Sequence, residues 1–157
     1  MKLTLIAVGK TSTDYIERAI AEYVRRVNRY IQMELCVIPD IKASKGLSEE
    51  SQKQREGQAI LSALQGGDVV VLLDERGKEL TSREFSAMIE RRMVQGLKRL
   101  VFIIGGPYGF SQDVYARADE KLSLSRMTFT HEMVRLFFTE QLYRAMTIMR
   151  GEPYHHD

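Results

Sequence analysis

The sequence predicts an α/β fold in a single domain over residues 1–157, with a parallel sheet and helices on both of its faces. Two observations predict this class. Five short apolar runs alternate with five segments of helical periodicity or helix-capping sequence, and the connections between them are short. Consecutive parallel strands need a crossover connection, and the helical segment between each pair of strands supplies it. The chain is also long enough for a core that needs no disulfide or metal.

The first 65 residues predict two strand–helix units. An apolar run over 3–8 ends at Gly9, and apolar side chains then recur at helical spacing as far as Tyr30. A second apolar run is stopped by Pro39. The expected elements are a strand over 3–8, a helix over 15–30, a strand over 33–38, an exposed loop over 40–47 and a helix over 48–65.

The remaining residues predict three further units. The β-branched run over 68–73 is typical of a strand covered on both faces. Thr81 and Glu84 have the spacing of a capping box, which marks the start of a helix. The expected strands are 68–73, 99–104 and 122–124, and the helices that follow them are 81–96, 111–118 and 132–150.

The last predicted helix is apolar around nearly its whole circumference. Its apolar residues are Met133, Val134, Leu136, Phe137, Phe138, Leu142, Ala145, Met146, Ile148 and Met149. Such a helix is either central in a large core or covered by a partner. At this chain length we expect a homodimer. The alternative is a helix that covers the sheet and leaves slightly apolar edges.

Composition narrows the class of protein. The longest uninterrupted apolar runs, 69–73 and 100–104, are five residues each, whereas a membrane helix needs about 20, so we expect no membrane partner. A single cysteine, Cys36, forms no internal disulfide and supplies no zinc cluster, which favours the reducing cytoplasm. The net charge is +2 without a basic tail. An RNA-binding protein of this composition would need a basic patch assembled by folding or by a partner subunit.

Three segments follow the carboxyl ends of predicted strands, where parallel sheets bind ligands. They are residues 74–78, 105–110 and 125–131. The glycines of 105–110 do not match the dinucleotide fingerprint because Pro107 interrupts it. They do allow the backbone to approach a flat ligand closely. A tight turn into the next helix is the alternative.

The carboxyl-terminal segment concentrates reactive side chains. They are all three histidines (His131, His155 and His156), Arg144, Glu140 and Tyr154. The structural alternatives are a helix cap for His131, a surface ion pair with Glu140 for Arg144, and a frayed chain end. Adjacent histidines have an awkward geometry for a shared metal, so we expect no metal site. The residues by themselves identify no reaction.

Five motifs in order supply a resemblance. They are Leu72-Leu73-Asp74-x-x-Gly77-Lys78, Ile104-Gly105-Gly106-x-x-Gly109, Ser123-Leu124-Ser125-x-x-Thr128-x-x-His131-x-x-x-Arg135, Glu140-Gln141-x-Tyr143-Arg144-Ala145 and Pro153-Tyr154-His155-His156. In this combination, and over its whole length, the chain resembles the RlmH family, the small SPOUT-class methyltransferases of bacterial 23S ribosomal RNA. Each motif alone is weak, but the ordered set is specific.

The resemblance implies a C-terminal trefoil knot, a homodimer, and S-adenosylmethionine as methyl donor without a metal. It implies that the acceptor is N3 of a pseudouridine in 23S rRNA, on the assembled ribosome. It also implies Leu73 at the end of its strand, Gly106 in the glycine loop, and the run Ser125, Arg126, Met127, Thr128, Phe129 and Thr130 as the residues that bind the donor.

Chemistry then suggests roles for the tail. N3 of a uracil-like ring must lose its proton, and the negative charge spreads onto O2 and O4. A guanidinium stabilises such an anion with two donors, which we assign to Arg144. A histidine is a suitable proton acceptor, either His155 or His131. Tyr154 is expected to position the base.

Contact with RNA is expected from Arg25, Arg26 and Arg29 on the first helix and from Lys42 and Lys45 in the loop. A solvated helix face and an exposed loop are the alternative. Two competing functions remain at this point. One is a non-catalytic ribosome-binding factor with the same fold, and the other is a flavodoxin-like protein that binds a small nucleotide.

Overall fold

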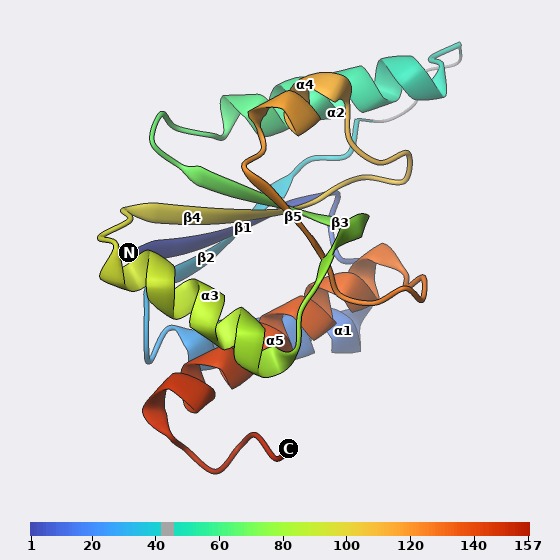
Figure 1. Ribbon diagram of the computed structural model, residues 1–157. Helices are drawn as coiled ribbons and strands as arrows, with labels where there is room; N and C mark the ends of the chain where they lie inside the picture. Colours follow the sequence, from blue (N-terminus) through green and yellow to red (C-terminus); the bar gives the residue numbers. More distant parts are fainter. Residues whose placement is uncertain (42–45) are drawn as a thin grey trace.

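The computed structural model describes residues 1–41 and 46–157, in which five strands alternate with five helices (Figure 1). The elements are β1 (Lys2–Val8), α1 (Asp14–Val27), β2 (Met33–Ile38), α2 (Glu49–Ser62), β3 (Val69–Glu79), α3 (Ser82–Val94), β4 (Arg99–Ile104), α4 (Gln112–Arg117), β5 (Glu120–Ser123) and α5 (His131–Arg150). Every predicted strand and helix among these residues is present, and its ends lie within three positions of the predicted ones except at the carboxyl end of β3.

The five strands form a parallel sheet in the order β2-β1-β4-β3-β5. Helices α1, α3 and α5 cover one face, and α2 and α4 cover the other (Figure 1). The predicted α/β class is therefore confirmed. Alternate side chains of each strand point to opposite faces, so Phe102 packs in the cluster under α5 while Val101 and Ile103 pack in the cluster under α2 and α4.

An aromatic trio anchors α3 and α5 to the sheet. The ring centroids of Phe102 and Phe138 lie 4.7 Å apart, and Phe85 lies 6.0 Å from Phe102 and 5.9 Å from Phe138. All three side chains are buried. Tilted aromatic pairs at these distances add to the stabilisation from apolar burial.

Helix α5 is only partly covered by this chain. Its inner face, with Phe138 and Leu142, is buried, whereas Phe137 is 40% exposed. In the described residues no helix has both the length and the apolar character that crossing a membrane requires.

The strand that was predicted to end at Leu73, β3, is longer in the structure. The strand continues to Glu79, and its pairing with β5 shifts register between Leu73 and Lys78. Segment 74–78 is thus a bulged continuation of β3 and not a free loop. A Cβ on Gly77 would lie 2.5 Å from the Leu122 backbone nitrogen, so glycine lets β5 pass closely at this bulge.

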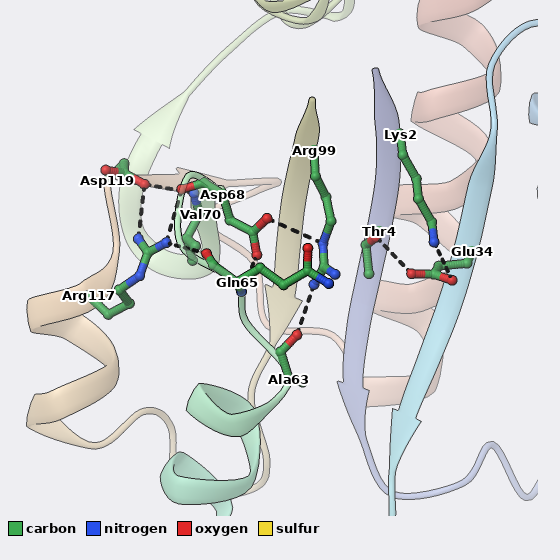
Figure 2. Close-up of polar contacts among 10 residues, drawn as sticks. All are labelled: Lys2, Thr4, Glu34, Ala63, Gln65, Asp68, Val70, Arg99, Arg117 and Asp119. Atoms are coloured by element: carbon green, nitrogen blue, oxygen red, sulfur yellow. Dashed lines mark hydrogen bonds and ion pairs between the residues drawn. The ribbon is translucent and has the colours of Figure 1, made fainter. Parts of the chain in front are cut away.

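Polar contacts close the amino-terminal edge of the sheet (Figure 2). The Asp68 carboxylate accepts the Gln65 N–H at 2.8 Å and lies 3.5 Å from Arg99 Nε. The Asp119 carboxylate accepts the Val70 N–H at 2.8 Å. These contacts hold the starts of β3 and β4 in place, at the edge opposite the carboxyl ends.

Candidate functional site

A cavity of about 600 Å³ lies at the carboxyl ends of β3, β4 and β5. Its walls come from three segments far apart in the sequence, 73–76, 104–110 and 122–131, with Lys53 from α2 and Val134 from α5. The volume is in the range of small-molecule sites. The fold therefore brings the three predicted ligand segments to one place.

The glycine loop 105–110 is a tight turn that also forms a cavity wall. Gly109 N–H donates to the Gly106 carbonyl oxygen at 3.2 Å, and Gly109 has φ of +80°. Pro107 and Tyr108 at the tip are exposed. The turn expected from the sequence is therefore present, and the same loop lines the cavity; its close approach to a flat ligand stays a prediction.

The structure separates the eight residues expected to bind the donor into two groups. Those that line the cavity are Leu73, Gly106, Ser125, Met127, Thr128 and Phe129. Arg126 does not line it and instead faces Glu79, with 3.4 Å between Nε and Oε1. Thr130 also lies outside and caps α5, where its hydroxyl accepts the Met133 N–H at 3.3 Å.

Local hydrogen bonds shape the segment that enters α5. The Ser125 hydroxyl accepts the Met127 N–H at 3.0 Å, and the Ser123 hydroxyl donates to the Ser125 carbonyl oxygen at 3.0 Å. The rings of Phe129 and Phe137 lie 4.9 Å apart. The cavity wall in this segment is thus fixed by its own serines and by packing on α5.

Asp74 and Tyr115 close another part of the cavity. The Tyr115 hydroxyl donates to the Asp74 carboxylate, which also accepts the Arg76 N–H at 2.8 Å. Burial, and then the bond to Asp74, raises the pKa of Tyr115 to about 12. The sequence pattern missed Tyr115 and Lys53 as cavity residues, because no local signal links α4 or α2 to the end of β3.

A second group of residues, here called the tail cluster, consists of Glu140, Tyr143, Arg144, Tyr154 and His155. Arg144 Nη2 donates to Glu140 Oε1 at 2.5 Å, and the Tyr154 hydroxyl donates to the same oxygen at 3.0 Å. The Arg144 guanidinium also lies over the Tyr154 ring, 4.9 Å from its centroid. The chain end is therefore docked and not frayed, and the expected Glu140–Arg144 pair exists as part of a larger network.

The contacts of His155 define its proton position. A guanidinium only donates hydrogen bonds, so the 3.2 Å contact from Arg144 Nη1 requires His155 Nδ1 to be unprotonated. Nε2 then carries the proton and donates to Asp157 Oδ1 at 3.0 Å. Arg83 binds the same carboxylate through Nε at 2.8 Å.

Tyr154 is held in its protonated form. Burial first, and then hydrogen bonds with Tyr23 and Glu140, raises the pKa of its hydroxyl well above the ordinary value. The phenol can therefore donate a hydrogen bond or position another group. It is poorly suited to accept a proton as a phenolate.

Two of the arginines expected to contact RNA are already paired. Arg25 and Arg26 both bind Glu22, and these bonds lower the pKa of the Glu22 carboxyl to about 2. Arg26 also lies over the rings of Tyr23 and Tyr143, 5.4 Å from each centroid. Arg26 therefore supports the tail cluster. Arg29 is exposed, and Lys42 and Lys45 lie outside the described residues.

The four expected catalytic residues do not meet within one chain. His131, the first residue of α5, lines the cavity. Arg144 lies on the same helix, roughly 20 Å further along its axis at 1.5 Å per residue, with Tyr154 and His155 beside it. In the described part of the chain no group of three or more His, Cys, Asp or Glu residues is arranged to hold a metal ion.

Comparisons with known proteins show which family this chain is similar to. The family described as "Predicted SPOUT methyltransferase" matches residues 1–155. "Ribosomal RNA large subunit methyltransferase H" of Parabacteroides distasonis is 59% identical over 157 residues, all of both chains. The protein of the same name from Christiangramia forsetii is 57% identical over 156 residues, 99% of each chain.

A solved structure gives an independent match to the fold. It is a probable methylase family protein from Haemophilus influenzae, with a TM-score of 0.53 and 12% identity. The match covers 95% of this chain and 66% of the Haemophilus chain. At this identity the likeness concerns the fold alone.

Proposed function

Because this chain belongs to the SPOUT methyltransferase family, among its RlmH members, we propose that it methylates N3 of a pseudouridine in 23S ribosomal RNA with S-adenosylmethionine as donor. The observation that carries this proposal is the cavity, since six of the eight residues implied to bind the donor line it. The proposed setting is the assembled ribosome in the cytoplasm.

The residues present fit the donor. Leu73 and Phe129 offer apolar surface for a flat base, Ser125 and Thr128 offer hydroxyls, and Asp74 offers negative charge near a cationic ligand. When bound, S-adenosylmethionine supplies a methyl group already activated by its sulfonium. The protein therefore has to align the donor with the acceptor and remove one proton.

The tail cluster is suited to the acceptor base. Arg144 presents two donors to the anion that forms when N3 loses its proton, and Glu140 holds that guanidinium in place. When a base oxygen takes the Arg144 donor, the lone pair of His155 Nδ1 becomes free to accept the proton. Tyr154 stays protonated and can position the base. His131, at the cavity, is the alternative acceptor or a relay.

A homodimer would unite the two halves of this chemistry. The cavity and the tail cluster lie far apart along α5, and the outer side of that helix carries exposed Phe137. A second copy packed on α5 would cover this side and bring its tail cluster to the cavity. The trefoil knot implied by the family belongs to the same proposal.

Two measurements test the proposal. Calorimetry should show that the wild-type chain binds S-adenosylmethionine, and absence of binding at millimolar donor would refute a methyltransferase. Labelled donor should then be incubated with intact ribosomes, separated subunits and naked rRNA. We expect label in 23S rRNA of ribosomes. Donor binding without label on any of the three would favour a non-catalytic ribosome-binding factor.

A further inference from the structure

Glu56, in α2, is a buried carboxyl group that the chemistry above does not use. The residue is 2% exposed. Its Oε1 accepts from Gln52 Nε2 at 3.2 Å, whereas Oε2 is buried without a hydrogen-bond partner in the described part of the chain. Because an unsatisfied buried oxygen costs folding free energy, its presence calls for a reason.

Glu56 lies directly behind the glycine loop. A Cβ built on Gly106 would lie 2.3 Å from Glu56 Oε2, 2.8 Å from Cδ and 2.9 Å from Oε1, and these are its three nearest atoms. Gly106 does not have a positive φ, so the obstacle to a side chain here is the Glu56 carboxyl group, which is itself buried and has little room to move aside. The missing side chain would point at α2. Close approach to a ligand, the reason expected from the sequence, is therefore not what excludes a side chain at this position.

Helix α2 supports the loop at more than one point. A Cβ on Gly57 would lie 2.3 Å from the Ser111 hydroxyl oxygen, so α2 also touches the chain where the loop enters α4. One turn before Glu56, Lys53 lines the cavity. Helix α2 thus carries one cavity residue, Lys53, and makes a close contact at each end of the loop, with Gly106 and with Ser111.

We propose that Glu56 is a positioning residue for the methyl donor. Its carboxyl group fixes the distance between α2 and Gly106, and through Gly106 it sets how far loop 105–110 projects into the cavity. The inference rests on the proposed function for the identity of the ligand. The contact between Glu56 and Gly106 does not depend on it.

A double-mutant cycle tests this contact. The variants are Glu56→Ala, Gly106→Ala, the two combined, the isosteric Glu56→Gln, and Gln58→Ala as an exposed control on the same helix. For each full-length protein we would measure the Kd of S-adenosylmethionine, the KM and kcat for methylation of ribosomes, and the thermal midpoint. The thermal midpoint needs no donor, so it tests the contact even if the wild-type chain binds none and the proposed function fails.

We expect Gly106→Ala to weaken donor binding about 100-fold and Glu56→Ala about tenfold, because a displaced cavity wall loses contacts with the donor, and each factor of ten in Kd corresponds to about 1.4 kcal/mol. At saturating donor, kcat of Glu56→Ala should stay within about twofold of wild type because the tail cluster is untouched. Removing the Glu56 side chain makes room for a methyl group, so the double variant should bind donor more tightly, and melt higher, than Gly106→Ala alone. Glu56→Gln and Gln58→Ala should resemble wild type.

Three outcomes would overturn the inference. One is wild-type donor affinity in Glu56→Ala. Another is a double variant that neither binds the donor more tightly nor has a higher thermal midpoint than Gly106→Ala. The third is a Glu56→Gln variant as impaired as Glu56→Ala, since a side chain of the same shape should support the loop equally well.

Discussion

Arg144 and Glu140 lie one turn apart on α5, with 2.5 Å between Nη2 and Oε1. Their side chains are only 24% and 19% exposed, so this pair is less screened than an ordinary helix-surface pair. The same Glu140 oxygen accepts the Tyr154 hydroxyl. One carboxylate therefore orients both side chains that we expect to meet the RNA base.

Replacing Glu140 with Gln should slow methylation without weakening donor binding. The amide oxygen still accepts the Arg144 donor but carries no charge, and the difference between a charged and a neutral hydrogen bond is about 1–1.5 kcal/mol, so kcat should fall about 5- to 10-fold. Calorimetry should give the wild-type Kd for the donor. Glu90→Gln, at an exposed position of α3, is the control. An unchanged kcat in Glu140→Gln would contradict the orienting role.

Substitution of each histidine should identify the proton acceptor. His155→Gln should lower kcat about 100-fold or more, which is the range for loss of a general base. His131→Gln should have a smaller effect that appears in the KM of the donor, because His131 lines the cavity. The reverse pattern would assign the proton transfer to His131.

Mixed dimers should recover activity that neither parent has. Arg144→Ala disables the tail cluster and Gly106→Ala weakens the donor cavity, so each homodimer should be nearly inactive at a donor concentration well below the Kd of Gly106→Ala. If the tail of one subunit serves the cavity of the other, co-expression yields dimers with one intact composite site. About half of the dimers formed on co-expression are mixed, and each mixed dimer has one intact site out of two. Labelling of ribosomes should therefore return to roughly a quarter of the wild-type rate. Recovery absent in a verified mixed dimer would show that each chain uses its own tail.

Glu132 should make stability depend on pH in the acid range. Its carboxylate accepts the Thr13 hydroxyl at 2.7 Å and also the Ser12 N–H, and these bonds lower its pKa from 4.5 to about 2. A lowered pKa in the folded state stabilises the protein above the unfolded pKa. That contribution should be lost as pH falls from 4.5 toward 2. The free energy of unfolding, followed by urea titration at several pH values, should fall less steeply in Glu132→Gln than in wild type.

Asp68→Asn should destabilise the fold and leave the cavity intact. Asp68 is buried beside Arg99 at the amino-terminal edge of the sheet (Figure 2), and weakening the polar contacts of a buried group costs about 1–3 kcal/mol. Urea unfolding at neutral pH should show the loss, whereas the folded protein should keep its donor affinity. The same change at exposed Asp113 should cost much less. Equal losses at the two positions would contradict the buried-pair argument.

Local sequence determined the elements of this protein. The apolar runs, the capping box at Thr81 and Glu84, and the helical spacing of α1 and α5 depend on neighbours within a few residues. The structure confirms the capping box, in which the Thr81 hydroxyl accepts the Glu84 N–H and Glu84 accepts the Thr81 N–H. The parallel direction of the strands followed from the alternation of strands and helices along the chain.

The sequence also located the three segments that line the cavity, because the carboxyl ends of parallel strands meet at one edge. It did not determine that Glu56 stands behind Gly106, that Tyr115 binds Asp74, or that Arg26 supports the tail cluster. These contacts join residues from separate elements, and no periodicity records which helix face will meet which loop. The separation of His131 and Arg144 along α5 follows from the helix rise alone, whereas the position of His131 at the cavity depends on how α5 docks against the sheet. The sequence by itself specified the helices and strands and the edge of the sheet where the cavity lies. Only tertiary packing decided which side chains meet at that edge.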